Sequence, residues 1–170
     1  MCAARARQGL VTAESRPSRS VIGTVAAGYN PTRVAPSADG TTVWVADRGG
    51  DQLLAFSATN LRADPAHSQL AAVQVGEAPV GLALVKGDRE LVVADSNRFG
   101  TPGAAAKLTV VRTTAALAHH QALVGTISTG TFPREIALEP DSVGNGKTLR
   151  PGPPPARRRG SRRIGLMYAG

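Results

Sequence analysis

The 170-residue chain has one cysteine, one tryptophan and two tyrosines, and only 4% of its residues are aromatic. Cys2 has no second cysteine to pair with, which excludes an internal disulfide and implies no thiolate metal site. No run of about 18 apolar residues is present, so no membrane-spanning helix is expected. The basic first seven residues also lack the apolar segment of a secretory signal peptide.

Common catalytic motifs are missing as well. No serine stands in a Gly-x-Ser-x-Gly setting, and the glycines of 100–103 belong to an insertion rather than to a phosphate-binding loop. His67, His119 and His120 fall in connections between predicted strands, without further ligands at metal-binding spacing. The sequence therefore predicts no metal, no cofactor and no catalytic residue set.

What the chain does contain is an internal repeat. A pattern of Val or Ile, then Gly, then Pro occurs at residues 25–31, 73–79 and 127–133. Gly28 and Gly76 are 48 residues apart, and Gly130 follows 54 residues later. The first two copies agree as far as Ala46-Asp47 and Ala94-Asp95. Recurrence at this period is typical of a repeat architecture.

Each unit contains short apolar runs separated by turn residues. The runs lie at 43–46, 53–56, 72–75, 82–85, 91–94 and 108–111. Apolar and β-branched runs of this length, bounded by Gly, Pro, Asn and Asp, predict strands. Asp39-Gly40 predicts a hairpin turn, because glycine accepts positive φ without steric cost. Four strands in about 40–50 residues are typical of one β-propeller blade.

The detailed pattern resembles the YVTN family of bacterial β-propellers. The match is best from Val34 to Asp47, where Ser-Ala-Asp-Gly precedes Val-Trp-Val-Ala-Asp and Trp44 takes the Tyr position. The resemblance covers roughly residues 21–149. It implies an all-β fold, a partial β-propeller of about three four-stranded antiparallel blades, and an exported or cell-envelope location.

The repeats suggest boundaries along the chain. We expect an N-terminal end with a remnant strand of a preceding blade (1–20), blade repeats at 21–68 and 69–120, a partial repeat at 121–149, and a disordered Arg/Pro-rich tail at 150–170. A closed propeller needs about four to eight blades. The chain is therefore expected to be a piece of a larger propeller or to complete its ring with other chains, and its uncovered blade faces predict self-association.

The net charge of +8 is unevenly distributed. Residues 21–149 hold seven Arg and three Lys against seven Asp and four Glu, whereas residues 150–170 hold six Arg and no acidic residue. The neutral repeat region argues against nucleic-acid binding. The tail has three interpretations: a disordered segment without a role, the product of a shifted reading frame, or a basic arm that contacts phosphates.

Candidate ligand contacts follow each repeat proline. Propeller blades place their first strand around a central channel, and by resemblance that strand begins at Pro31, Pro79 and Pro133. The next two positions differ between units, as Thr32-Arg33, Val80-Gly81 and Arg134-Glu135. Variable polar residues on a constant scaffold favour a site there. We therefore select Arg33, Arg134 and Glu135.

Asp47 and Asp95 allow two interpretations. They could form a rim of carboxylates for a cation or a sugar hydroxyl. The favoured alternative is structural, because an aspartate that recurs in both complete units suits a role that every blade needs, such as accepting hydrogen bonds from nearby backbone N–H groups.

The sequence favours a non-catalytic propeller that presents a binding surface to a protein, a glycan or a small molecule. The alternative is a fragment of a propeller enzyme, such as a sugar-lactone hydrolase or a quinoprotein-like dehydrogenase. Both come from the resemblance to the propeller families rather than from any catalytic motif in the chain.

Overall fold

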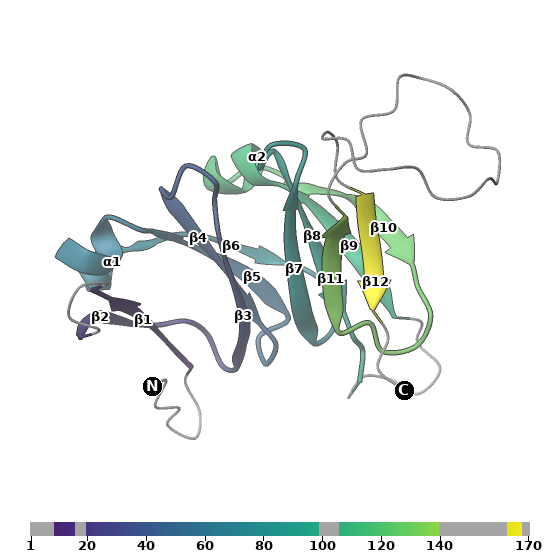
Figure 1. Ribbon diagram of the computed structural model, residues 1–170, viewed down its shortest axis with the longest axis horizontal. Helices are drawn as coiled ribbons and strands as arrows, with labels where there is room; N and C mark the ends of the chain where they lie inside the picture. Colours follow the sequence, from purple (N-terminus) through teal and green to yellow (C-terminus); the bar gives the residue numbers. More distant parts are fainter. Residues whose placement is uncertain (1–8, 16–19, 99–105, 140–162, 168–170) are drawn as a thin grey trace, which may run out of the picture.

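The computed structural model describes residues 9–15, 20–98, 106–139 and 163–167. Two four-stranded antiparallel sheets form its centre (Figure 1). The first sheet contains β3 (Pro31–Pro36), β4 (Thr42–Asp47), β5 (Gln52–Ser57) and β6 (Gln69–Gln74) in that order. The second contains β7 (Pro79–Val85), β8 (Glu90–Asp95), β9 (Lys107–Arg112) and β10 (Leu123–Ser128). Below they are called sheet 1 and sheet 2.

A two-stranded sheet flanks the centre on either side. On the N-terminal side β1 (Leu10–Glu14) pairs with β2 (Val21–Ala26), and on the C-terminal side β11 (Glu135–Glu139) pairs with β12 (Arg163–Met167). The repeat units that begin at residues 21 and 69 thus start with β2 and β6. Each of these strands is the outer strand of the preceding sheet. The sheets themselves begin at Pro31 and Pro79.

Strand β12 differs from the prediction of a disordered segment at 150–170. The Pro/Gly/Arg composition of this tail suggested that no part of it could form a sheet, but residues 163–167 read Arg-Ile-Gly-Leu-Met and contain no proline. Such a run can pair with a strand, and β12 lies antiparallel to β11. Residues 140–162, which include the expected turn at Gly144-Asn145-Gly146, are outside the described ranges, as are the insertion at 99–105 and the segments 1–8, 16–19 and 168–170.

The runs in the central strands β4, β5 and β8 are apolar at nearly every position because these strands are buried on both faces. Successive side chains of a strand point to opposite faces. On β4, Val45 packs in a cluster with β1 and β2, whereas Trp44 packs in a second cluster with sheet 2. On β8, Val93 contacts sheet 1 and Val92 contacts β11. Strands buried on both faces have continuous apolar runs instead of polar–apolar alternation.

The connections occupy equivalent places in the two sheets. Tight turns join the first two strands of each sheet. The turn at Asp39-Gly40 has a positive φ at Gly40, and the turn at residues 86–88 has a positive φ at all three residues. Short helices lie between the third and fourth strands: α1 (Asn60–Ala63) and a 3-10 turn (Pro65–His67) in sheet 1, and α2 (Thr113–Leu117) in sheet 2. Both sheets are thus built on one plan.

The sheets are arranged as a fan. Strand β7 contacts β3 on one side and β11 on the other, so the first strands of successive sheets lie next to one another (Figure 1). The fourth strands β6 and β10 lie at the outside, where Leu123, Val124 and Ile127 are exposed. The chain has an all-β fold that is consistent with a partial β-propeller, and its described strands form two whole blades between two half blades.

Candidate functional site

The three inner strands bring the predicted ligand contacts to one place. Arg33 on β3, Gly81 on β7 and Glu135 on β11 each stand two residues after the repeat proline. Within their own sheets, Arg33 and Gly81 occupy the same register position, opposite Ala46 and Ala94. We call the surface formed by β3, β7 and β11 at these positions the axial face.

Arg33 and Glu135 form an ion pair across this face. The guanidinium Nη2 of Arg33 donates a hydrogen bond of 2.8 Å to Oε1 of Glu135, although 102 residues separate them. Both side chains are close to half exposed, at 41% and 50%. The pair therefore spans three blades and remains open to solvent.

Gly81 lies between the two partners. A methyl group at this position would approach the Arg134 carbonyl oxygen to 3.2 Å, the Glu135 Cα to 3.3 Å and the Ala94 Cβ to 3.1 Å. These distances are tighter than ordinary van der Waals contacts, so glycine lets β11 approach β7 closely.

Arg134 and Thr32 stand one residue after the repeat proline. Both are exposed, and Thr32 donates from its hydroxyl to the carbonyl oxygen of Pro79 at 3.0 Å, which joins β3 to β7. Arg134 is the equivalent residue on β11. The axial face thus presents a guanidinium group and a carboxylate, and exposed Arg134 precedes Glu135 in the chain. A guanidinium group is suited to binding a carboxylate.

The recurrent aspartates are buried and belong to the framework. Asp47 is fully buried. Its Oδ1 accepts hydrogen bonds of 2.8 Å from the backbone N–H groups of Tyr29 and Asn30, and its Oδ2 accepts one of 3.0 Å from Gln52. A methyl group at Gly28 would lie 2.0 Å from Oδ2 of Asp47. The aspartate therefore closes the Gly-x-x-Pro loop that begins its own sheet, as the structural interpretation predicted.

Asp95 is the equivalent residue of sheet 2 but has different partners, and the Ala78 N–H of its loop donates to Asp51 at 2.8 Å instead. The Oδ2 of Asp95 accepts a hydrogen bond from the Thr109 hydroxyl, and a methyl group at Gly76 would lie 2.4 Å from that oxygen. Its Oδ1 has no hydrogen-bond partner among the described residues. Burial raises the pKa of Asp95 to about 6, although the hydrogen bond from Thr109 and the charge of Lys107 oppose the increase.

The histidines lie away from the axial face. His67 contacts Asp64 at 2.8 Å on an exposed connection, and His119 and His120 follow α2 beside the outer strands. In the part of the chain that the structure describes, no three His, Cys, Asp or Glu side chains gather as a metal site would require. No helix there is long and apolar enough to cross a membrane.

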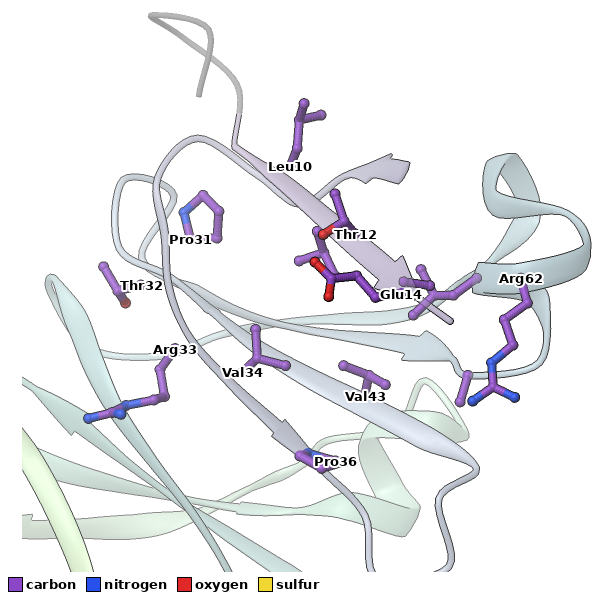
Figure 2. A pocket seen from close by; sticks show the side chains of 14 residues that line it. Leu10, Thr12, Glu14, Pro31, Thr32, Arg33, Val34, Pro36, Val43 and Arg62 are labelled. Atoms are coloured by element: carbon purple, nitrogen blue, oxygen red, sulfur yellow. The ribbon is translucent and has the colours of Figure 1, made fainter. Parts of the chain in front are cut away.

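Sequence reasoning selected Arg33, Arg134 and Glu135 separately but missed that Arg33 and Glu135 pair with each other. The sequence feature that could have indicated this pair is Gly81, the glycine at the equivalent position of the middle repeat. Sequence reasoning also missed a groove of about 500 Å³ between β1 and the inner strands of sheet 1 (Figure 2). It is lined by β1 and by residues of β3 and β4, among them Val34 and Val43. Figure 2 shows Arg33 extending away from β1.

No protein-family model and no curated protein matches the chain. Among solved structures, it is similar to hydrazine synthase from Kuenenia stuttgartiensis, with a TM-score of 0.64 and 19% identity over 77% of this chain and 33% of that chain. It is also similar to a functionally unknown protein from Desulfotomaculum acetoxidans DSM 771, with a TM-score of 0.60 and 12% identity over 76% and 37% of the two chains.

The chain therefore spans about a third of the length of these two solved structures. At identities of 19% and 12%, the likeness concerns the fold and not the activity. Hydrazine synthase is a β-propeller-containing protein, so the comparison agrees with the fan of sheets: the chain has a propeller-like all-β fold.

Proposed function

We propose that this chain consists of YVTN-type propeller repeats that bind a partner at the axial face and catalyse no reaction. The observation that carries the proposal is the half-exposed Arg33–Glu135 pair, which lies beside exposed Arg134 on the innermost strands. The framework around these residues repeats, whereas the residues themselves differ from blade to blade. Such variation on a constant scaffold is how a binding site is added to a fold.

The YVTN assignment is supported by the way the repeated residues meet. Gly28 and Asp47 are 19 residues apart, as are Gly76 and Asp95, and each glycine packs against its aspartate. The two recurrent motifs are therefore two halves of one contact. This explains why the spacing and the turn chemistry recur together in the sequence.

The charges suggest the class of ligand. Arg33, Glu135 and the adjacent Arg134 together carry a local excess of positive charge. A guanidinium binds a carboxylate through two parallel hydrogen bonds, and the Glu135 carboxylate can accept from a hydroxyl group. We propose a small molecule, glycan or protein segment that presents a carboxylate next to hydroxyl groups.

A titration with glucuronate and citrate tests this proposal. We expect amide NMR shifts centred on Arg33, Gly81 and Glu135, and loss of those shifts in the Arg134→Ala variant. The matched control is Arg112→Ala, which removes an exposed arginine from the end of β9. Shifts centred on His119 and His120, or equal loss in both variants, would contradict the proposal. Hydrolysis of gluconolactone by the chain would instead favour the enzyme alternative.

A further inference from the structure

The described strands divide into two whole blades and two complementary halves. Strands β1 and β2 occupy the positions of the third and fourth strands of a blade, because Val25 on β2 is the repeat equivalent of Val73 on β6. Strands β11 and β12 occupy the positions of the first and second strands. Strand pairing in the described ranges joins β1 to β2 and β12 to β11. One end has the outer half of a blade and the other end has the inner half.

The face of sheet 1 that carries β1 and β2 is only half covered. Val34 and Val43 are the repeat equivalents of Leu82 and Leu91, which are 8% and 0% exposed beneath sheet 1. Val34, by contrast, is 48% exposed, and Val43 is half buried. The outer part of this face is covered, because Phe56 is fully buried against β1 and β2.

The uncovered part is the groove of about 500 Å³ beside β1 (Figure 2). Every residue of β1 lines it on one side, and Val34, Pro36 and Val43 line it on the other. At the interface between sheets 1 and 2, the equivalent space holds β3 and β4, whose Ala35 and Trp44 pack against Leu82 and Leu91. The groove therefore has the position of a missing inner hairpin.

The β11–β12 pair consists of the first two strands of a blade, so it is an inner hairpin of the kind that the groove lacks. Ala137 is the repeat equivalent of Ala35, since each stands four residues after the repeat proline. Ile136 and Leu138 pack against sheet 2, so Ala137 is on the opposite face of β11, the face that Ala35 presents to sheet 2 from β3. The hairpin cannot fill the groove of its own chain, because both whole sheets lie between them (Figure 1).

We propose that a second copy of this chain places its β11–β12 hairpin in the groove, pairing β12 with β1 to complete a four-stranded blade. The interface repeats the one between sheets 1 and 2, with Ala137 of one copy against Val34 and Val43 of the other. In the same arrangement, Arg134 of one copy takes the place of Thr32, next to the Pro31 carbonyl of the other.

The number of copies follows from the number of blades. The described strands of one copy form two whole blades and two halves, so the described strands of two copies provide six blades, within the range of about four to eight that closes a ring. Three copies would provide nine, outside that range. A head-to-tail interface makes a closed assembly when its rotation completes a circle, and here each copy both gives a hairpin and receives one.

The oligomeric state of the full chain tests the proposal. Sedimentation equilibrium should give a mass twice the 17.5 kDa of one chain. The Val34→Lys variant places a charge in the groove and should reduce the mass by half, with the β-sheet circular dichroism unchanged. The control is Val21→Lys, at a position 51% exposed on β2 and outside the groove, which should remain dimeric. A monomeric chain, or assemblies larger than two copies, would overturn the proposal.

Chemical cross-linking gives a second measurement that does not depend on a destabilising variant. In a Cys2→Ser background, Val34→Cys and Ala137→Cys are introduced together and treated with a short thiol-reactive cross-linker. We expect covalent dimers, and also dimers when two singly substituted chains are mixed. The pair Val21→Cys and Ala137→Cys should give none. Absence of cross-linked dimers from the first pair at dimer-forming concentrations would show that the hairpin is not in the groove.

Discussion

The aspartate at the end of β4 fixes the loop with which sheet 1 begins. In sheet 1, Asp47 accepts hydrogen bonds from two backbone N–H groups of the loop before β3, at Tyr29 and Asn30. Those N–H groups would otherwise be left without partners, since no strand pairs with the loop. One side chain thus fixes the loop, the start of β3 and the end of β4.

Replacing this aspartate should be costly. The Asp47→Ala change leaves two loop N–H groups without their acceptor and removes the partner of Gln52, so we expect a loss of about 2–4 kcal/mol in unfolding free energy. Urea denaturation measures the loss. The control is Asp64→Ala, which removes an exposed carboxylate on a connection and should change stability by less than about 0.5 kcal/mol. Equal effects of the two changes would contradict the role of Asp47.

Asp95 should make stability depend on pH. Its pKa is about 6 in the folded chain and near the ordinary 3.8 when unfolded, so the folded state binds more protons between these values. The stabilisation from the protonated carboxyl is complete below pH 3.8 and is lost as the pH rises through 6. Relative to Asp95→Asn, the native chain should lose up to about 3 kcal/mol between pH 4 and 7, measured by urea denaturation. A constant difference would contradict this.

The sequence predicted single residues better than pairs of residues. The recurrence of Asp47 and Asp95 pointed to a framework role, because only a need common to all blades repeats in this way. The ion pair between Arg33 and Glu135 had no such signal: its partners occur once each, 102 residues apart. The one indication in the sequence is Gly81, which has no side chain and stands at the equivalent position of the middle repeat.

At the scale of elements, burial on both faces explains which strands the sequence revealed. The runs at β4, β5 and β8 are apolar at nearly every position, because one face packs on the preceding blade and the other on the following blade. These strands therefore lack the polar–apolar alternation of a strand buried on one face only. The turn residues on either side of them can still be recognised in the sequence. Strand β12 was missed because it follows a Pro/Arg-rich segment, and a five-residue run has little signal of its own.

Substitutions in a buried central strand and in an outer strand should differ in their effect on the free energy of unfolding. Phe56→Ala removes a fully buried side chain from the cluster between sheet 1 and the β1–β2 pair. We expect it to lower the free energy of unfolding by about 3–5 kcal/mol, as large-to-small changes in a core do. The matched change Val124→Ala lies on outer strand β10 at a position 49% exposed. It should cost less than about 0.5 kcal/mol, and denaturant titration of both variants checks the contrast.

At the scale of the whole molecule, the main contacts between the described sheets join neighbours in the fan. Stability in such an architecture is approximately a sum over blades and the interfaces between them. The Arg33–Glu135 pair is the exception, since it joins the first whole blade to the half blade beyond the second. The fold class and the uncovered end faces were predictable, because the repeat period requires a fan of a known kind. The groove was not predictable, because it forms only where the outer strands of a blade are present without the inner ones, and the repeat period does not show this.

The long-range ion pair should contribute little to stability. Its partners are 41% and 50% exposed, so water and salt screen their attraction. A double-mutant cycle with Arg33→Ala and Glu135→Ala should give a coupling energy below about 1 kcal/mol, smaller still at high salt. A coupling of several kcal/mol would show that the pair holds the blades together rather than presenting charge at the axial face.

Each Gly-x-x-Pro loop packs its glycine on an aspartate of the same blade, so the 48-residue period is close to a structural module. If residues 28–75 were deleted, Ala27 would be joined to Gly76, and the loop at Gly76 would still meet its own partner, Asp95. The hydrogen bond from the Ala78 N–H to Asp51 of the preceding blade would have to form again with the blade that takes its place. Gene duplication and loss could therefore change the number of blades in whole steps, with the contacts between successive blades rebuilt at each new junction.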